Sequence, residues 1–426
     1  MASKDLRALF DEIADPRVQR TRRHRLTDVL VVVLLGTVVG CPGWDSIERF
    51  ASAREGELRE ILTLPGGIPS ADTLRRVMKA VDPTALSKVL TSWTDALCET
   101  FAGKQVAIDG KSIRGTLEAA SGQGALHVVN AWVCEHQMVL GQYATDVKSN
   151  EITAIPKLLE LLSLRGSTVT IDAIGCQKGI AKAIVDKGAD YIFGLKSNQP
   201  TLHEEVLGAF DAATRARLAE DPRSYSETAD KGHGRNEMRR VWVNRNVSWL
   251  TQSEQWPALR TLILVEAERT RRGVRSCERR AYISSCDEPA EVLASKVRGH
   301  WHVENRLHWV LDVTFGEDHA RISRKHGAEN MSVMRKLGMN LLSRAPAAME
   351  GRDESRRQKA MSAAWNFSYL LTVLTGAEVA PPLRKKRAPV GARAWDKPRS
   401  YERLGSKGRS APGMQQPPEH RDDAVE

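Results

Sequence analysis

Two short stretches decide the fold: AIDGKSIRG at residues 107–115 and VTIDAIGCQ at residues 169–177. In each, an apolar run typical of a buried strand stops at an aspartate, which is Asp109 in the first and Asp172 in the second. A glycine or an alanine follows and leaves room for water or a phosphate group. The pair is a candidate catalytic centre, although a lone aspartate at a strand end is more often a turn former.

Further patterns place these two strands within a sheet. The predicted strands cover residues 105–108, 126–133, 138–145, 167–171 and 190–195, and the predicted helices cover residues 150–162, 178–187 and 199–210. Residues 135–137 join the second and third strands as an antiparallel hairpin. The order β-β-β-α-β-α-β-α predicts a ribonuclease-H-like α/β core with helices on both faces of a mixed sheet. In that sheet the fourth strand lies beside the first, so Asp109 and Asp172 would face each other.

A third carboxylate is expected from a later helix, in the stretch RGHWHVENRLHWVLDV at residues 298–313. Glu304 lies there among apolar residues, so we expect it to be partly buried and to need a cation or a donor. The alternative is a surface glutamate paired with His300 or His308, each of which is four residues away.

The histidines of this stretch make a zinc site a rival. His300 and His308 each lie about one helical turn from Glu304, but His302 lies about 200° around the helix from it, so the four side chains do not converge. Three carboxylates without a cysteine favour Mg²⁺ or Mn²⁺ instead. Two such ions about 4 Å apart activate a water or a 3′-hydroxyl and stabilise the leaving oxygen in a phosphoryl displacement.

The composition fits a protein that meets a polyanion. The 426 residues include 63 Lys and Arg against 53 Asp and Glu, which gives a net charge of +10. Six cysteines without a C-x-x-C pair favour reduced thiols in the cytoplasm. The longest apolar run, residues 29–41, is shorter than the roughly 20 residues that span a bilayer, and the N-terminal residues do not read as a signal peptide. We therefore expect a cytoplasmic protein outside the membrane, and residues 29–41 as a buried core element.

The length predicts two or three domains. The predicted regions are a helical N-terminal domain at residues 1–100, a catalytic domain at 101–345 with a β-rich insertion at about 211–288, a helical segment at 346–380 and a tail at 381–426. The insertion strands are predicted at residues 239–247, 259–268 and 279–284. The N-terminal domain, with its basic run at residues 17–25, would bind DNA or only pack on the next domain. The tail carries 11 Lys and Arg against 6 Asp and Glu, and its composition predicts disorder.

These stretches together resemble one known family. IDGKSIRG, KSNEITAIPKLLELL, VTIDAIGCQK, DYIFGLKSNQP, GHGRNE and GHWHVENRLHWVLDVTFGEDHAR occur in this order over roughly residues 5–345. They are similar to the DDE transposases of the ISAs1 group of bacterial insertion sequences, which are IS4-like and related to the H-repeat-associated proteins. The resemblance implies a ribonuclease-H-like catalytic domain behind a helical domain, and an acidic triad on Asp109, Asp172 and Glu304.

The resemblance also implies the reaction. A metal-dependent enzyme would hydrolyse a phosphodiester at each element end, and the freed 3′-hydroxyl would attack target DNA. The cofactor would be Mg²⁺, which Mn²⁺ can replace, and the partner would be double-stranded DNA held by a homodimer, because two ends are cut. The rivals are a domesticated DNA-binding protein without catalysis, a nuclease without strand transfer, and a zinc hydrolase.

Expected DNA contacts complete the hypothesis. The wider IS4-like signature has Tyr, Arg and Lys around the third acid, where this chain has Val297, His300 and Leu311. Arg298, Arg306 or Lys111 would then contact the terminal phosphate. Other candidates come from the insertion.

Trp242 or Trp249 would stack on a flipped base, as an insertion-domain tryptophan does in the wider family, although a strand tryptophan is more often core. His233 and Arg235 of GHGRNE would contact phosphates or the end sequence, although this segment also suits a plain turn.

Overall fold

The computed structural model describes residues 5–98, 100–116, 124–145, 151–232, 235–271, 274–320, 322 and 326–376. The described residues all belong to one compact unit. The basic tail predicted at residues 381–426 lies wholly outside the described residues, so its disorder stays a prediction.

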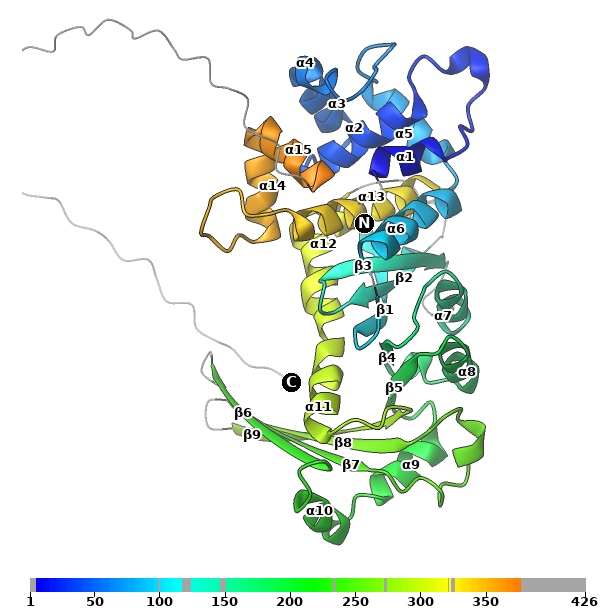
Figure 1. Cartoon of the computed structure of the whole chain (residues 1–426), viewed down its shortest axis with the longest axis vertical. Coiled ribbons are helices and arrows are strands. Elements are labelled where there is room, and N and C mark those ends of the chain that lie inside the picture. The colour runs from blue at the N-terminus through cyan, green and yellow to red at the C-terminus, as the bar shows by residue number, and fades with distance from the viewer. Residues whose placement is uncertain are drawn as a thin grey trace, which may run out of the picture. The chain divides into compact units, whose positions relative to one another are not determined.

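A nine-stranded mixed sheet runs through the compact unit in the order β3-β2-β1-β4-β5-β9-β8-β7-β6 (Figure 1). Its first five strands are β1 (Gln105–Ile113), β2 (Leu126–Val133), β3 (Met138–Thr145), β4 (Thr168–Ile171) and β5 (Asp190–Leu195). β1, β2 and β3 pair antiparallel, whereas β4 pairs parallel with both β1 and β5. This is the strand order of a ribonuclease-H-like core, so the fold predicted from the sequence is confirmed.

The β-rich insertion extends this sheet. It supplies β6 (Tyr225–Gly232), β7 (Arg235–Asn244), β8 (Thr261–Arg271) and β9 (Val274–Ser284), and β9 pairs antiparallel with β5. The sequence predicts three of these four strands. The fourth, β6, reads YSETADKG and is the outermost strand, so it lacks the apolar alternation that would reveal it.

Helices cover both faces of the sheet, as predicted (Figure 1). Three helices, α7 (Glu151–Glu160), α8 (Lys178–Asp186) and α9 (Pro200–Gly208), share a hydrophobic core with β1, β4 and β5. On the opposite face, α11 (Ala290–His300) packs on β7 and β8. Neighbouring residues of β5 show the two sides, because Tyr191 and Phe193 belong to the first core and Ile192 to the second.

The first hundred residues are helical, as the sequence predicts. The helices are α1 (Leu6–Asp11), α2 (Leu26–Val38), α3 (Trp44–Ala53), α4 (Glu55–Leu58), α5 (Ala71–Ala80) and α6 (Pro83–Leu97). Every residue of α2 is buried, so the apolar run at residues 29–41 is mainly a core helix. These helices share one core with α13 (His326–Arg344), whose Asn330 donates to the carbonyls of Met78 and Val81.

Two short helices, α14 (Arg356–Trp365) and α15 (Phe367–Thr375), close the described part of the chain. Within that part, no helix has both the length and the apolar character that crossing a membrane requires.

Candidate active site

Two aspartates lie side by side where β1 and β4 separate. Parallel pairing ends with Ile108 opposite Ile171, so Asp109 and Asp172 are the next residues on adjacent strands. β1 continues beyond the predicted 105–108, and Asp109 lies opposite Asn130 of β2. The register therefore brings the two predicted aspartates to one edge of the parallel pair.

The backbone after β4 fixes the direction of Asp172. This residue caps a short 3-10 helix, η5 (Ala173–Gly175), and its Oδ1 accepts a hydrogen bond from the N–H of Ile174 at 3.1 Å. Such a cap holds the carboxylate in place without neutralising its charge.

Glu304 lies on a distorted helical segment. α11 ends at His300, a π-helix, η7 (Val303–His308), follows, and α12 (Trp309–Val313) resumes the α-helix. The predicted helix is present, but the predicted partial burial is wrong because Glu304 is exposed. A π-helix often marks a functional position, since its wider turn changes where side chains point.

The three carboxylates line one cavity of about 530 Å³. Lys196, Arg279 and Arg280 also line it. Within the described residues, no lysine or arginine forms an ion pair with Asp109, Asp172 or Glu304. The three carboxylates thus share one cavity without a direct cationic partner in the part of the chain that the structure describes.

The pKa values of the two aspartates show that the charged form of each carboxylate is disfavoured in this cavity. Burial, and then the negative charge of Asp172, raise the pKa of Asp109 to about 7. Burial, and then the charge of Glu151, raise the pKa of Asp172, although nearby backbone N–H groups and Lys196 lower it in part. Both carboxylates would therefore gain from a bound cation.

The donor set fits a divalent cation such as Mg²⁺ or Mn²⁺, because it consists of carboxylate oxygens. Asp109 and Asp172 would be the first ligands, since they are adjacent and unneutralised. In the described part of the chain, no three acidic, histidine or cysteine side chains converge closely enough to hold an ion as they stand. The exposed Glu304 would have to turn towards the aspartates to complete the set.

The histidines of the rival zinc site have other partners. His300 Nδ1 lies 3.1 Å from Thr170 Oγ1, and burial lowers the His300 pKa to about 4. His308 Nδ1 lies 3.6 Å from Asp109 Oδ2, and its Nε2 lies 3.5 Å from the amide nitrogen of Asn130. The structure therefore does not bring the histidines together around Glu304.

A buried acid and histidine pair lies behind β1 and was not predicted. Glu151, at the start of α7, has its Oε1 2.7 Å from His127 Nε2, and His127 Nδ1 lies 2.9 Å from Ser112 Oγ. The pair packs against Gly110, where a Cβ would collide with both side chains. No sequence signal marks Glu151, since a glutamate in a first helical turn is ordinarily a surface residue.

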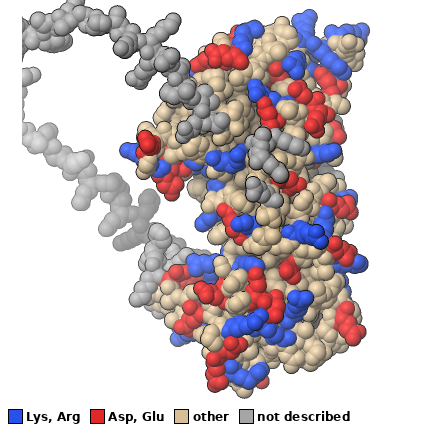
Figure 2. Space-filling view, in the orientation of Figure 1, with Lys and Arg blue, Asp and Glu red and all other residues tan. Residues whose placement is uncertain are grey.

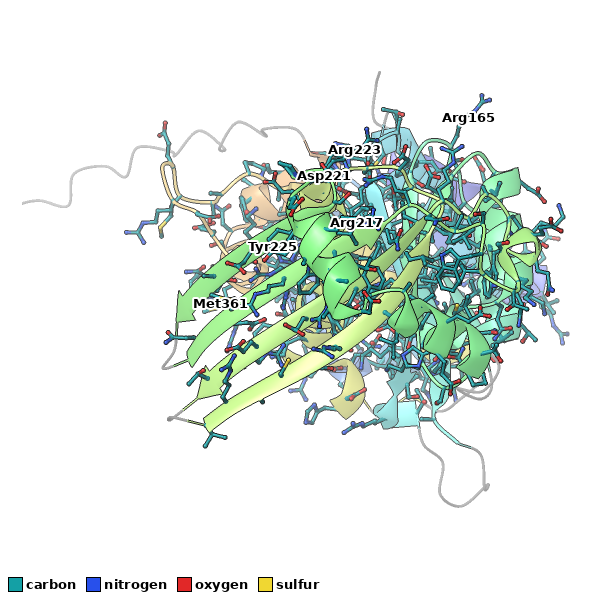
Figure 3. All side chains as sticks on the ribbon, turned by 90° about the horizontal axis from the view of Figure 1, so that it is seen from below. Arg165, Arg217, Asp221, Arg223, Tyr225 and Met361 are labelled. Carbon is teal, nitrogen blue, oxygen red and sulfur yellow. The ribbon has the colours of Figure 1, made fainter. Side chains whose placement is uncertain are left out.

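The geometry speaks against two of the predicted DNA contacts. Lys111 is 9% exposed, and its ammonium lies 2.8 Å from Asp312 and 3.2 Å from Asp318. Trp242 is 5% exposed and packs on Tyr225, with their ring centroids 5.5 Å apart (Tyr225 is labelled in Figure 3). The Lys111 side chain is therefore engaged in ion pairs within the protein, and the Trp242 ring is packed in the hydrophobic core.

The other candidates are differently placed. Arg298 is exposed and pairs with Asp230 at 2.8 Å, and Arg306 is also exposed. Trp249 is 45% exposed and donates its Nε1–H to the carbonyl of Asn246. His233 lies outside the described residues, and Arg235 is placed only as the first residue of β7.

Comparison with sequence families covers most of this unit. The family described as "Transposase DDE domain" matches residues 101–341, and the family described as "DDE_Tnp_1-associated" matches residues 7–94. The first match contains Asp109, Asp172 and Glu304.

Individual proteins are similar over much of their length. "Putative transposase YncI" of Escherichia coli O157:H7 is 37% identical over 88% of this chain and 95% of its own. "H repeat-associated putative transposase YhhI" of Escherichia coli K12 is 35% identical over 88% of this chain and 99% of its own. An uncharacterised Xanthobacter autotrophicus protein encoded in the dhlA 3′ region is 41% identical over 65% of this chain and 92% of its own.

Among solved structures, the piggyBac transposase synaptic complex with hairpin DNA has a TM-score of 0.39 and 12% identity, and the match covers 90% of this chain and 79% of that one. That likeness is too low to carry an argument.

Proposed function

We propose a reaction and a residue assignment on the premise that this chain belongs to the Transposase DDE domain family and is a DDE transposase. The enzyme hydrolyses a phosphodiester at each end of an insertion sequence of the ISAs1 group. It then joins the freed 3′-hydroxyl to target DNA.

One observation carries the residue assignment. Asp109 and Asp172 follow the last paired residues of adjacent parallel strands and share a cavity with Glu304, without an ion pair to lysine or arginine in the described residues. Partly buried like charges at Asp109 and Asp172 favour a site for a cation and a phosphate rather than a structural role. Asp109 and Asp172 hold the metal from the sheet, and Glu304 completes the site from the helical side.

The cofactor in this proposal is Mg²⁺, which Mn²⁺ can replace. Bound divalent ions lower the pKa of an attacking water and stabilise the leaving oxygen. The protein holds the carboxylates in place through the β1–β4 register and the Asp172 cap. Lys196, on the cavity wall, is placed to attract the phosphate.

The substrate is double-stranded DNA, both element ends and target. Two ends must be cut together, so the active form on DNA is a homodimer. The proposed division of labour assigns residues 1–100 to end binding, 101–345 to catalysis with an insertion at about 211–288, 346–380 to a helical support, and 381–426 to a basic tail. The enzyme works in the cytoplasm, where bacterial DNA lies.

Strand joining on a supercoiled plasmid tests the reaction, with DNA ends from the flanks of the encoding gene and with Mg²⁺, Mn²⁺ or EDTA. We expect metal-dependent joining that falls by at least about 10³-fold in Asp172→Asn and in Glu304→Gln, because each removes a catalytic carboxylate. Asp186→Asn is the matched control, since this exposed aspartate on α8 pairs only with Lys182 among the described residues.

The other outcomes identify the rivals. Cleavage without joining would make the protein a nuclease. End-specific binding without cleavage in either metal would make it a non-catalytic DNA-binding protein.

A further inference from the structure

A second opening, the arginine cleft, lies next to the carboxylate cavity. It has a volume of about 420 Å³, and the lining residues that matter here are Arg239, Arg269, Arg280, Arg298, Glu237 and Trp301. One wall is the sheet extension formed by β7, β8 and β9, and the other is the junction of α11 with η7.

The cleft forms where one face of the sheet changes from apolar to basic. Val241 and Val265 pack with Val297 of α11 in a hydrophobic core. Arg239 lies two residues before Val241 on β7 and is therefore on the same face of the sheet. Arg280 lies on β9 directly opposite Val265. The helix therefore covers the apolar half of this face, and the arginines line the space beyond it.

The four arginines outnumber the carboxylates that line the cleft, and two of the four are held only by exposed ion pairs. Glu237 is the one carboxylate on the described lining, and it pairs with Arg239 at 2.6 Å and with Arg269 at 3.4 Å. Arg280 pairs with Glu278, and Arg298 pairs with Asp230, through half-exposed contacts that contribute little stability. A phosphate group could replace either carboxylate at small cost.

One buried polar atom in the cleft lacks a hydrogen-bond partner among the described residues. It is Nδ1 of His302, whereas Nε of Arg269 lies 3.4 Å from Glu237 Oε2. Buried polar groups are nearly always satisfied, so the His302 atom indicates that a ligand or water completes the site.

The arginine cleft and the carboxylate cavity share a wall. Arg280 and Trp301 line both, and the Arg280 guanidinium lies 4.7 Å from the centre of the Trp301 ring. Trp301 is 38% exposed. In the view of Figure 2, basic and acidic side chains are interspersed over the described surface, so local pockets matter more than a uniformly basic face.

We propose that the arginine cleft binds the phosphodiester backbone of an unpaired DNA strand where it leaves the carboxylate cavity. The inference rests on the proposed function and deepens it, because it names the form of DNA that the site takes. At about 420 Å³ the cleft is within the range of small-molecule sites, roughly 300–1,000 Å³, so it has room for a nucleotide of one strand. Arginines beside an aromatic ring are the usual means of holding single strands.

Fluorescence anisotropy of labelled element-end DNA in EDTA tests the cleft independently of catalysis. The probes are a blunt duplex and the same duplex with a single-stranded fork of either polarity. We expect the wild type to prefer one forked probe. The double variant Arg239→Gln, Arg280→Gln should lose at least about tenfold in affinity for that probe, while its affinity for the blunt duplex changes less than about twofold.

The salt dependence gives a second readout. Each lost phosphate contact on a single strand reduces the slope of log affinity against log salt by about 0.7, so the double variant should lose about 1.4. The matched control is Arg165→Gln, Arg217→Gln, because both arginines, which are labelled in Figure 3, are exposed and line neither the cleft nor the carboxylate cavity. Arg298→Gln tests the helical wall without changing the sheet, and it should also weaken forked binding.

Three results would overturn the inference: equal affinity of the wild type for blunt and forked DNA, a double variant that binds like the control, or an equal loss on both probes. The outcomes also separate the two proposals. If the wild type joins strands but shows no preference for forked DNA, the proposed role of the cleft is wrong and the proposed reaction stands. If it prefers forked DNA but joins no strands in either metal, the proposed reaction is wrong and the cleft is still a strand-binding site.

Discussion

Two groups of carboxylates lie close together along β1, and they differ in what surrounds them. In the carboxylate cavity, Asp109 and Asp172 have no lysine or arginine ion pair among the described residues. Two residues further along β1, Lys111 is buried between Asp312 and Asp318. Burial acts on both groups, but in the second the protein supplies the cation.

The difference separates a structural cluster from a functional one. In the second group burial raises the pKa of Asp312, but Lys111 lowers it in part, so the fold itself compensates some of the charge. Asp109 and Asp172 are a partly buried pair of carboxylates without such a cation, and their repulsion lowers the stability of the protein when no ligand is bound. Groups with such a cost are found mainly at functional sites, where a ligand relieves it. Pairing therefore marks the site better than burial or acidity does.

Breaking the paired cluster should have the largest effect on stability. Lys111→Met leaves Asp312 without a cationic partner among the described residues, and Asp318 with only the exposed Arg114 at 3.8 Å, so we expect the free energy of unfolding to fall by about 3–5 kcal/mol. Urea unfolding measures it. Lys182→Met, which breaks an exposed pair with Asp186, is the matched control and should cost less than about 1 kcal/mol.

A triple variant shows whether the loss comes from unpaired charge. Lys111→Met combined with Asp312→Asn and Asp318→Asn should recover a large part of the lost stability, because no buried charge is left alone. A loss below about 1 kcal/mol in Lys111→Met alone would contradict the contrast between the two clusters.

The unpaired cluster should respond in the opposite direction. The pKa of Asp109 is about 7 in the folded protein against an ordinary 3.8, so the folded state binds this proton more tightly than the unfolded state. Stability in EDTA should therefore fall as the pH rises from about 4 to 7. Asp109→Asn should remove that loss and raise stability at pH 8, by no more than about 4 kcal/mol at roughly 1.4 kcal/mol per pH unit.

Urea unfolding in EDTA between pH 4.5 and pH 8 measures the effect, which should shrink towards the acid end. Asp312→Asn is the matched variant from the paired cluster. Burial raises the pKa of Asp312, but the loss of a partner of the more deeply buried Lys111 outweighs this effect, so the variant should lower stability at pH 8. If Asp109→Asn lowers stability at pH 8 as much as Asp312→Asn does, the unpaired charge is not what distinguishes the site.

Strand alternation and chain order account for the part of the site that the sequence predicts. An apolar run that ends at Asp109 and another that ends at Asp172 suffice, because parallel register fixes which residues become neighbours. The helical nature of residues 1–100 is predicted in a similar way from local patterns. These features depend on residues that are near one another in the chain.

The features that the sequence misses depend on contacts between distant residues. Lys111 meets Asp312 across 201 positions, and Asn130 meets His308 across 178. The sequence makes Trp242 a candidate for base stacking, but in the structure Tyr225 and the sheet bury its ring. The exposure of Glu304 results from a π-helix, whose turn differs from the α-helical period that the pattern assumes.

His308 lies at the boundary of the two clusters and gives the smallest predicted effect. Burial, and then the positive charge of Lys111, lower its pKa to about 3, so the ring is neutral. Its Nε2 faces the amide nitrogen of Asn130, which can only donate, so its Nδ1 carries the hydrogen and points at Asp109 Oδ2. At 3.6 Å this contact is longer than a hydrogen bond, so we expect the neutral ring to restrain the position of Asp109 and not to neutralise its charge.

His308→Gln should weaken Mn²⁺ binding by about 10–100-fold, because outer partners orient metal-binding carboxylates. Isothermal titration of the protein with Mn²⁺ measures this directly, without DNA or turnover. His203→Gln is the control, since His203 lines the same cavity from α9. Unchanged Mn²⁺ affinity in a stably folded His308→Gln would mean that strand register alone positions Asp109. A loss that occurs in His308→Gln and not in His203→Gln would mean that the His308 ring keeps Asp109 in position to bind the metal. The two clusters would then differ in this respect, because Lys111 positions Asp312 and Asp318 through its own charge.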